Sequence, residues 1–156
     1  FQPHPQLETL RKKAIPWGRK ELTAPWTLPD AAETAWEILL EIPAQQQTGG
    51  LLLQVGNCFA LELTLVSRTL HAYVKDTGEQ TMQDCGTLQL VPGVPVRLQV
   101  FLDRCSAEIF ADGKCLSVNV FDTAPLRPVS LIPQGGTLPL QLLQVWHLQH
   151  VMEPQT

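Results

Sequence analysis

The sequence predicts an all-β fold, a sandwich of two antiparallel sheets that follows a proline-rich connector. Thirteen prolines and ten glycines interrupt the 156 residues at short intervals. The segments between them are of strand length and are rich in Leu, Val, Ile and Phe. Many of these segments alternate apolar and polar residues, which is the period of a strand with one buried face. Short strands at this spacing are typical of a sandwich or a barrel.

Size and composition fit one globular domain. A chain of 17.3 kDa can bury roughly 70% of its unfolded surface. Hydrophobic residues make up 44% and charged residues 17% of the sequence, which is not the composition of a disordered chain. No apolar run is long enough for a membrane-spanning helix. The net charge of -4 and the short basic stretch 11–20 predict neither a nucleic acid nor a membrane as partner.

The cysteines point to a reducing compartment. There are four in the chain and no C-x-x-C pair among them, which is too few for a disulfide scaffold and the wrong spacing for a zinc or redox site. The first five residues lack the features of a signal peptide. We therefore expect free thiols and a cytoplasmic protein.

The N-terminal segment differs from the rest of the chain. Residues 1–30 are expected to form a connector that packs on the sandwich, and residues 31–156 the sandwich itself. Within the connector only residues 6–14 are free of proline and periodic, and they are expected to form a short helix. The prolines that interrupt the other stretches are Pro3, Pro5, Pro16, Pro25 and Pro29.

The first group of strands begins at residue 36. Within 36–42, Trp36, Ile38, Leu40 and Ile42 fall on one face, and the two glutamates, 37 and 41, fall on the other. The strands predicted next are 51–55, 59–66 and 70–75, and a turn at 76–78 follows them. The second group of predicted strands comprises 96–102, 105–110, 114–121, 129–132 and 138–149.

One hairpin can be predicted in register. Asp112-Gly113 between two alternating segments favours a two-residue type I′ turn, which needs positive φ at both positions. Opposing residues then have numbers that sum to 225. This pairing places Ala107, Ile109, Leu116 and Val118 in the core, and it leaves 106, 108, 110, 115, 117 and 119 mostly solvated. Cys105 and Cys115 fall on opposite faces, so they are expected to pack as small apolar side chains and not to form a disulfide.

Chemistry-bearing residues form no familiar catalytic pattern. A glycosidase needs two carboxyl groups across a sugar-sized cleft. The strand-borne candidates are Glu37, Glu41, Glu62, Asp103 and Glu108. The first three occupy the polar phase of alternating strands and are expected to be solvated, and Asp103 is expected in a turn or an ion pair.

Cofactor motifs are also missing. His147 and His150 are three residues apart, which puts them on opposite faces of a strand, so no metal site is predicted. No phosphate loop, dinucleotide fingerprint, nucleophile elbow or zinc-protease motif occurs, and no cofactor is predicted. Core packing is the ordinary role of the aromatic residues. Trp17, Trp26 and Tyr73 are kept as candidates for contact with carbohydrate or with another domain.

One stretch resembles a known family. Residues 100–110, Val-Phe-Leu-Asp-Arg-Cys-Ser-Ala-Glu-Ile-Phe, with the Asp-Gly turn after them, resemble the D-R-S-S-V-E-V-F signature in the C-terminal β-sandwich of glycoside hydrolase family 32. Cys105 and Ala107 depart from that signature. Residues 2–11 are similar to the segment that leaves the family's catalytic propeller, and residues 143–148 resemble its closing strand. The signature positions, which the resemblance implies to be structural, are Asp103, Arg104, Ser106, Glu108, Phe110, Asp112 and Gly113.

The resemblance implies a concanavalin-like sandwich without catalytic residues. In the family the nucleophile lies in W-M-N-D-P-N-G, the transition-state stabiliser in R-D-P and the acid/base in an E-C pair, all on an N-terminal five-bladed propeller. This chain contains no Asp-Pro and no Glu-Cys. It is expected to be a fragment or separate piece of a longer fructosidase, which a start inside the connector favours, or else a freestanding relative.

Two functional classes follow. In the first, the chain is the accessory sandwich of a β-fructofuranosidase acting on sucrose or sucrose 6-phosphate. There it stabilises the catalytic propeller and takes part in forming a homodimer. In the second, it is a lectin-like module that binds fructan or another glycan by itself. A large exposed apolar patch favours the first class, and exposed aromatic side chains on a concave face favour the second.

Overall fold

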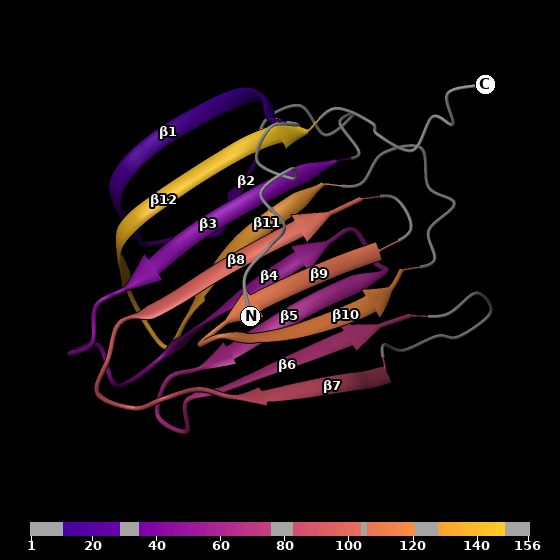
Figure 1. Ribbon diagram of the computed structural model, residues 1–156. Coiled ribbons are helices and arrows are strands. Elements are labelled where there is room, and N and C mark those ends of the chain that lie inside the picture. The colour runs from indigo at the N-terminus through magenta and orange to yellow at the C-terminus, as the bar shows by residue number, and fades with distance from the viewer. Residues whose placement is uncertain (1–10, 29–34, 76–82, 104–105, 121–127, 149–156) are drawn as a thin grey trace, which may run out of the picture.

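The computed structural model describes residues 11–28, 35–75, 83–103, 106–120 and 128–148, with the backbone alone for 11–18. Every regular element within these residues is a β-strand. The strands form two six-stranded antiparallel sheets that lie face to face (Figure 1). An all-β, two-sheet sandwich is therefore confirmed. No helix among the described residues has the length and apolar character needed to span a membrane.

The first sheet, sheet A, has the strand order β1-β12-β3-β8-β9-β10. Strands from opposite ends of the sequence are neighbours in this sheet: the N-terminal strand β1 pairs with the C-terminal strand β12. The strands are β1 (Arg11–Leu22), β3 (Trp36–Ile42), β8 (Val96–Leu102), β9 (Ser106–Ala111), β10 (Lys114–Asn119) and β12 (Leu138–Leu148).

The second sheet, sheet B, has the order β2-β11-β4-β5-β6-β7. Its central strands β4, β5 and β6 follow one another in the sequence and pair as a meander. The strands are β2 (Trp26–Thr27), β4 (Gly50–Val55), β5 (Phe59–Thr64), β6 (Thr69–Val74), β7 (Gln83–Gln89) and β11 (Val129–Gln134).

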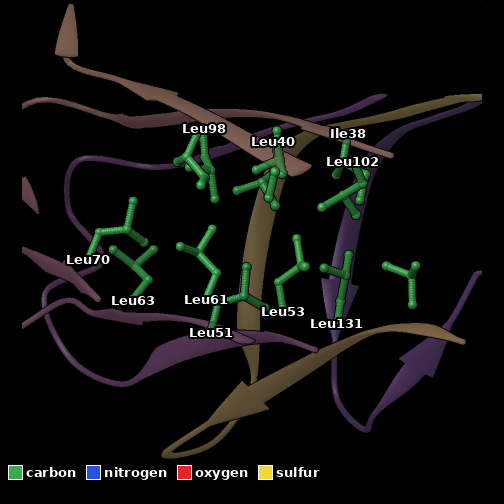
Figure 2. Packing of buried hydrophobic residues seen from close by; sticks show 14 of the residues in the cluster. Ile38, Leu40, Leu51, Leu53, Leu61, Leu63, Leu70, Leu98, Leu102 and Leu131 are labelled. Carbon is green, nitrogen blue, oxygen red and sulfur yellow. The ribbon is translucent and has the colours of Figure 1, made fainter. Parts of the chain in front are cut away.

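The core lies between the sheets and consists mainly of leucine side chains (Figure 2). Alternation explains this, because every second residue of a strand points to the same face. Sheet A contributes Ile38, Leu40 and Leu98, which are at most 1% exposed, and sheet B contributes Leu61 and Leu63 at the same level of burial. Truncating one such leucine to alanine typically costs about 2–5 kcal/mol.

All nine strands predicted from the sequence are present, and 36–42 and 96–102 have the predicted bounds. The strand β7 was not predicted, because Gln-Asp-Cys-Gly-Thr-Leu-Gln is mostly polar and does not alternate. It lies at the edge of sheet B, and five of its seven residues are exposed. The turn predicted at 76–78 lies outside the described residues.

The helix predicted for residues 6–14 is wrong where the structure describes it. Residues 11–14 belong to β1, which pairs with β12 from Arg11↔Leu148 onward. Pairing with a long neighbouring strand overrides the local helical pattern. Pro16 is tolerated in this strand because β1 is at the edge of sheet A, where one row of backbone groups needs no partner. Residues 6–10 lie outside the described part of the chain.

The predicted hairpin register is confirmed. Lys114 pairs with Ala111, Leu116 with Ile109 and Val118 with Ala107, and each pair of numbers sums to 225. Asp112 and Gly113 have φ values of 52° and 71°, as a type I′ turn requires. Ala107, Ile109 and Val118 are buried, and Leu116 is partly buried against the core.

One residue of that hairpin lies in an environment that the sequence did not predict. Phe110 is on the face expected to be solvated, yet it is 7% exposed. It packs edge-on against Phe101 of β8, with ring centroids 5.8 Å apart. Together with Ala35 and Leu148 these rings form a second, smaller apolar cluster, and Cys115 packs against it. Part of the outer face of sheet A is therefore buried as well.

Candidate functional site

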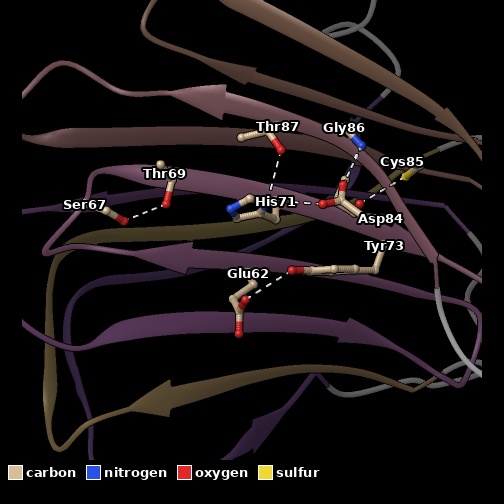
Figure 3. Close-up of polar contacts among 10 residues, drawn as sticks. Glu62, Ser67, Thr69, His71, Tyr73, Asp84, Cys85, Gly86 and Thr87 are labelled. Atoms are coloured by element: carbon tan, nitrogen blue, oxygen red, sulfur yellow. Dashed lines mark hydrogen bonds and ion pairs between the residues drawn. The ribbon is translucent and has the colours of Figure 1, made fainter.

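A group of polar side chains lies on the outer face of sheet B, across β5, β6 and β7 (Figure 3). We call it the outer polar face and define it by Glu62, His71, Tyr73, Asp84 and Thr87. Alternation in β5 and β6 places it there. The inward residues of these two strands are apolar and buried, and the residues between them point outward. The buried residues are Phe59, Leu61, Leu63, Leu70 and Ala72.

Strand pairing brings the members of this face together. Glu62 lies opposite His71, and His71 lies opposite Thr87. Tyr73 lies opposite Asp84. The five residues therefore occupy two neighbouring rows of the same surface, where adjacent strands are about 4.8 Å apart.

Polar contacts connect the side chains within and between these two rows (Figure 3). The Tyr73 hydroxyl donates a long hydrogen bond of 3.4 Å to Glu62 Oε1. His71 Nδ1 lies 3.0 Å from Thr87 Oγ1 and 3.5 Å from Asp84 Oδ2. The His71 and Tyr73 rings are nearly parallel, at 27°, with centroids 6.1 Å apart. The face thus combines two carboxylates, an imidazole and a phenol in one connected group.

A β-bulge positions Asp84. The register of β7 against β6 shifts between Ala72 and Tyr73, so that Cys85 is an extra residue between Asp84 and Gly86. The extra residue changes the alternation of β7, and Asp84 joins the outer face beside Tyr73. Asp84 Oδ1 accepts a hydrogen bond of 3.1 Å from the Gly86 backbone N–H, so the side chain of the bulge stabilises the bulge's own backbone.

Two groups of this region have shifted pKa values. Partial burial raises the pKa of Tyr73 above its ordinary value of 10.0, and the negative charges of Glu62 and Asp84 and the hydrogen bond to Glu62 raise it further. Burial also raises the pKa of the Cys85 thiol, and the Asp84 charge adds to this effect. The Cys85 thiol donates to the carbonyl oxygen of Ala72 at 3.2 Å. Both groups are therefore neutral at physiological pH.

The outer polar face is suited to hydrogen bonding rather than to metal binding. Within the described part of the chain, no three His, Cys, Asp or Glu side chains are close enough to hold a metal ion. Carboxylate and imidazole acceptors next to an aromatic ring instead suit a ligand with hydroxyl groups and an apolar ring face. Of the sequence candidates whose side chains the structure describes, Tyr73 and Glu62 belong to this face.

The signature residues lie elsewhere, on sheet A and its β9–β10 hairpin. The backbone N–H of Asp103 donates to the carbonyl of Ser106 at 2.9 Å. Ser106 and Glu108 are half-buried in β9. Arg104 lies outside the described residues. The roles implied for these positions by the resemblance stay predictions.

Asp112 connects the two sheets. Its carboxylate accepts a hydrogen bond from the backbone N–H of Val91. Two positions further on, the Lys114 ammonium donates to the carbonyl of Gln89. Gln89 ends β7 of sheet B, and Val91 lies in the loop from β7 to β8 of sheet A. The hairpin turn is therefore attached to the chain where it crosses between the sheets.

The solvated position expected for Glu37 is wrong. Its relative exposure is 0%, and its Oε2 atom accepts a hydrogen bond of 2.7 Å from Gln99 Nε2. Cross-strand neighbours on the outer face of sheet A, Phe101 and Trp146, flank it. Glu41 on the same face pairs with Arg97 at 2.8 Å. Sequence alternation identified the outward direction of Glu37, but not that this part of the face is covered.

The two tryptophan candidates differ from Tyr73. Trp26 is half-buried against the core, and the Lys20 ammonium lies 5.2 Å from the centre of its ring. The side chain of Trp17 lies outside the described part of the structure. Lys20 also lines a surface pocket of about 370 Å³, together with Arg19, Glu21, Pro43, Gln45, Pro139, Leu140 and Gln141.

Comparison with solved structures shows where this fold occurs. An exo-inulinase from Aspergillus awamori matches 95% of this chain with 32% of its own, at 13% identity and a TM-score of 0.70. A sucrose-6-phosphate hydrolase from Lactobacillus gasseri matches 94% of this chain with 30% of its own, at 14% identity and a TM-score of 0.61. A fructan 1-exohydrolase IIa from Cichorium intybus matches 95% of this chain with 37% of its own, at 13% identity and a TM-score of 0.63.

The chain thus spans only about a third of the length of these solved proteins, and at these identities they establish the fold alone. No curated protein matches the sequence. A family model described as the C-terminal part of the glycosyl hydrolases of family 32 matches residues 6–147, which is most of the chain. The chain therefore belongs to the C-terminal β-sandwich family of the family 32 glycosyl hydrolases.

Proposed function

We propose that this chain is the non-catalytic C-terminal sandwich of a β-fructofuranosidase that hydrolyses sucrose or sucrose 6-phosphate. In that enzyme it packs on an N-terminal five-bladed propeller and stabilises it. One observation carries the proposal: nearly the whole chain superimposes on about a third of an exo-inulinase, a sucrose-6-phosphate hydrolase and a fructan exohydrolase. The remaining two thirds of such proteins leave room for a separate catalytic domain.

The placement of the carboxylates supports this division of labour. Retaining glycosidases need two carboxyl groups about 5–5.5 Å apart on either side of a bound sugar, and inverting ones about 6.5–9.5 Å. Glu37 is fully buried beside Gln99. Glu41 is bound by Arg97 and by Gln141. These contacts hold both glutamates in structural roles and favour a catalytic centre on another domain.

A dense core fits a stabilising role. The described residues bury apolar side chains from all twelve strands in a single cluster or against it, with β1 contributing Leu22, β2 Trp26 and β7 Leu88. A domain that is rigid by itself offers a fixed surface to a neighbouring domain, and contact with such a surface shifts the neighbour's unfolding equilibrium. Association of two copies and a cytoplasmic location are further parts of the proposal.

The test compares three proteins: the chain alone, the proposed N-terminal catalytic domain alone, and the two together in one polypeptide. We expect hydrolysis of sucrose or sucrose 6-phosphate only where the upstream domain is present. We also expect a higher melting temperature for that domain when the sandwich is attached. Turnover by the chain alone that survives repurification and is lost in Asp103→Asn or Glu62→Gln would overturn the proposal. Sedimentation of the two-domain protein reports whether it dimerises.

A further inference from the structure

We propose that the outer polar face of sheet B binds a neutral oligosaccharide, with Tyr73 against a sugar ring and Glu62 and Asp84 as acceptors for its hydroxyl groups. The class of sugar, a fructose oligomer, rests on the function proposed above. The binding site itself rests on the arrangement of Glu62, His71, Tyr73, Asp84 and Thr87.

The chemical composition of the face matches a polyhydroxylated ligand. Vicinal hydroxyl groups are recognised by planar acceptors placed side by side, and Glu62, His71 and Asp84 supply three such groups on adjacent strands. Their spacing across the sheet is about 4.8 Å. The phenol of Tyr73 lies between the two carboxylates, near enough for both charges to act on it. An aromatic ring with polar groups on both sides is the usual arrangement for holding an apolar ring face and its hydroxyls together.

The charge of the face disfavours anionic ligands. Glu62 and Asp84 make it acidic at neutral pH, and they repel a phosphate, a sulfated glycan or a nucleic acid. A metal ion is disfavoured because the described residues offer no set of three ligands. A neutral polyol remains attractive, because each of its hydroxyl groups can donate to a carboxylate in a charge-assisted hydrogen bond.

The bulge at Cys85 explains how Asp84 comes to lie on this surface. Without the extra residue, Asp84 would follow the alternation of Gly86 and Leu88 toward the inner face. The bulge turns Asp84 outward to within 3.5 Å of His71. Bulges that redirect a side chain in this way occur preferentially at strand edges and next to functional sites. The Asp84 carboxylate stays 52% exposed, and the His71 side chain 31%, so both are accessible to a ligand.

Tyr73 is also the described aromatic candidate best placed for stacking. Trp26 lies on β2 at the opposite edge of sheet B, and it is engaged by Lys20 and by the core. Tyr73 is half-exposed on β6, and its outward neighbour across the strand is the small residue Ala60. The Tyr73 ring therefore has no large side chain directly opposite it on β5.

The experiment uses the single tyrosine of the chain as the reporter. The chain is prepared with ring-labelled tyrosine and titrated with an inulin-type fructo-oligosaccharide, while the NMR signals of Tyr73 are followed. Saturating shifts with a dissociation constant between about 0.1 and 10 mM are expected, which is the range of a shallow site with few hydrogen bonds. A maltooligosaccharide and a lysine-rich peptide serve as the sugar and charge controls.

Variants locate the site by calorimetric titration. Tyr73→Ala should abolish binding, and Asp84→Asn and Glu62→Gln should each weaken it about five- to tenfold. The matched control, Trp26→Phe, changes an aromatic residue at the far edge of the same sheet and should bind as the original chain does. Unchanged Tyr73 signals at high sugar concentration would overturn the inference, and so would equal loss in Trp26→Phe or shifts with the peptide alone. Neither result bears on whether the sandwich stabilises a catalytic domain, which the melting temperatures report separately.

Discussion

Replacing Asp112 with alanine is predicted to destabilise the sandwich more than any other change at that position considered below. Asp112 is the first residue of the hairpin turn between β9 and β10, and its φ of 52° lies in the left-handed region. Its carboxylate also accepts the hydrogen bond from Val91 N–H that attaches the hairpin to the chain between the sheets. One side chain therefore serves two purposes, and substitutions can separate them.

The magnitudes follow from these two contributions. A left-handed backbone costs an ordinary L-residue about 1–2 kcal/mol, but Asn and Asp less, and glycine nothing. The hydrogen bond is exposed, so we take about 1 kcal/mol for it, below the roughly 1.5–3 kcal/mol typical of a charged partner. Asp112→Ala loses both contributions and should cost about 2–3 kcal/mol. Asp112→Gly loses the hydrogen bond alone, about 1 kcal/mol, and Asp112→Asn retains an acceptor oxygen and should cost less than either.

Urea unfolding followed by tryptophan fluorescence measures this series. The order of stability should be Asp, Asn, Gly and Ala, with an unchanged dependence on urea if the transition stays two-state. Ser117→Ala, at an exposed position in the same hairpin, is the control and should stay within about 0.5 kcal/mol. Equal stability of the Gly and Ala variants would refute the argument from φ. An Asn variant as unstable as Ala would refute the argument from the hydrogen bond.

Further predictions concern three glycines and the contact between Tyr73 and Glu62. Gly113→Val should cost about 1 kcal/mol or more, because a β-branched residue resists the φ of 71°; an unchanged melting temperature would contradict the type I′ turn. Gly50→Ala should cost about 2–4 kcal/mol, because its Cβ would lie 2.1 Å from the Leu63 carbonyl oxygen. Gly93→Ala, with nothing within 4 Å of the added Cβ, should cost only about 1 kcal/mol for its positive φ, and equal thermal stability of the two variants would contradict this. Tyr73 should form tyrosinate, seen by its absorbance, at higher pH in the folded protein than in the unfolded chain, because its pKa is raised. Folding stability linked to the neutral phenol is fully present below the pKa of the unfolded chain. This contribution is lost as the pH rises through the pKa of the folded protein. Glu62→Gln should lower that titration midpoint, and a midpoint unaffected by the change would argue against the contact.

The sequence predicted those parts of the fold in which local pattern and tertiary environment agree. Strand β3 alternates, and its inward residues are buried as the pattern implies. The hairpin register followed from one Asp-Gly turn, because a two-residue loop fixes all later pairs by counting. The strand β1 could not be predicted, since its position depends on pairing with β12, whose partner residues lie between 116 (Leu22↔Leu138) and 137 (Arg11↔Leu148) residues later. The strand β7 could not be predicted either, because an exposed edge strand has no buried face to impose alternation.

The sequence predicted the outer polar face only in part. The sequence indicates Glu62 and Tyr73 as separate candidates. Counting across the turn between β5 and β6 places Glu62 opposite His71. Asp84 and Thr87 could not be added, because they belong to β7 and because the bulge at Cys85 reverses the direction of Asp84. The prediction that Glu37 is solvated was wrong for a different reason. Alternation gives the direction of a side chain and not what covers it, so a fully buried carboxylate can occupy a phase that usually faces solvent.

The residues that identify the family and the residues that offer a binding surface lie on different sheets, and the physics of the two sets explains why. A hairpin that sits at the edge of sheet A, with β9 between β8 and β10, is held by a turn geometry and a few buried contacts that allow few substitutions. Asp112, Gly113 and Phe110 are such positions. The outer face of sheet B has no such constraint, because its core contacts are made by the inward residues of the same strands. Its outward positions are free to carry acceptors and an aromatic ring without loss of stability, so a signature restricted to the hairpin carries no information about what this face binds.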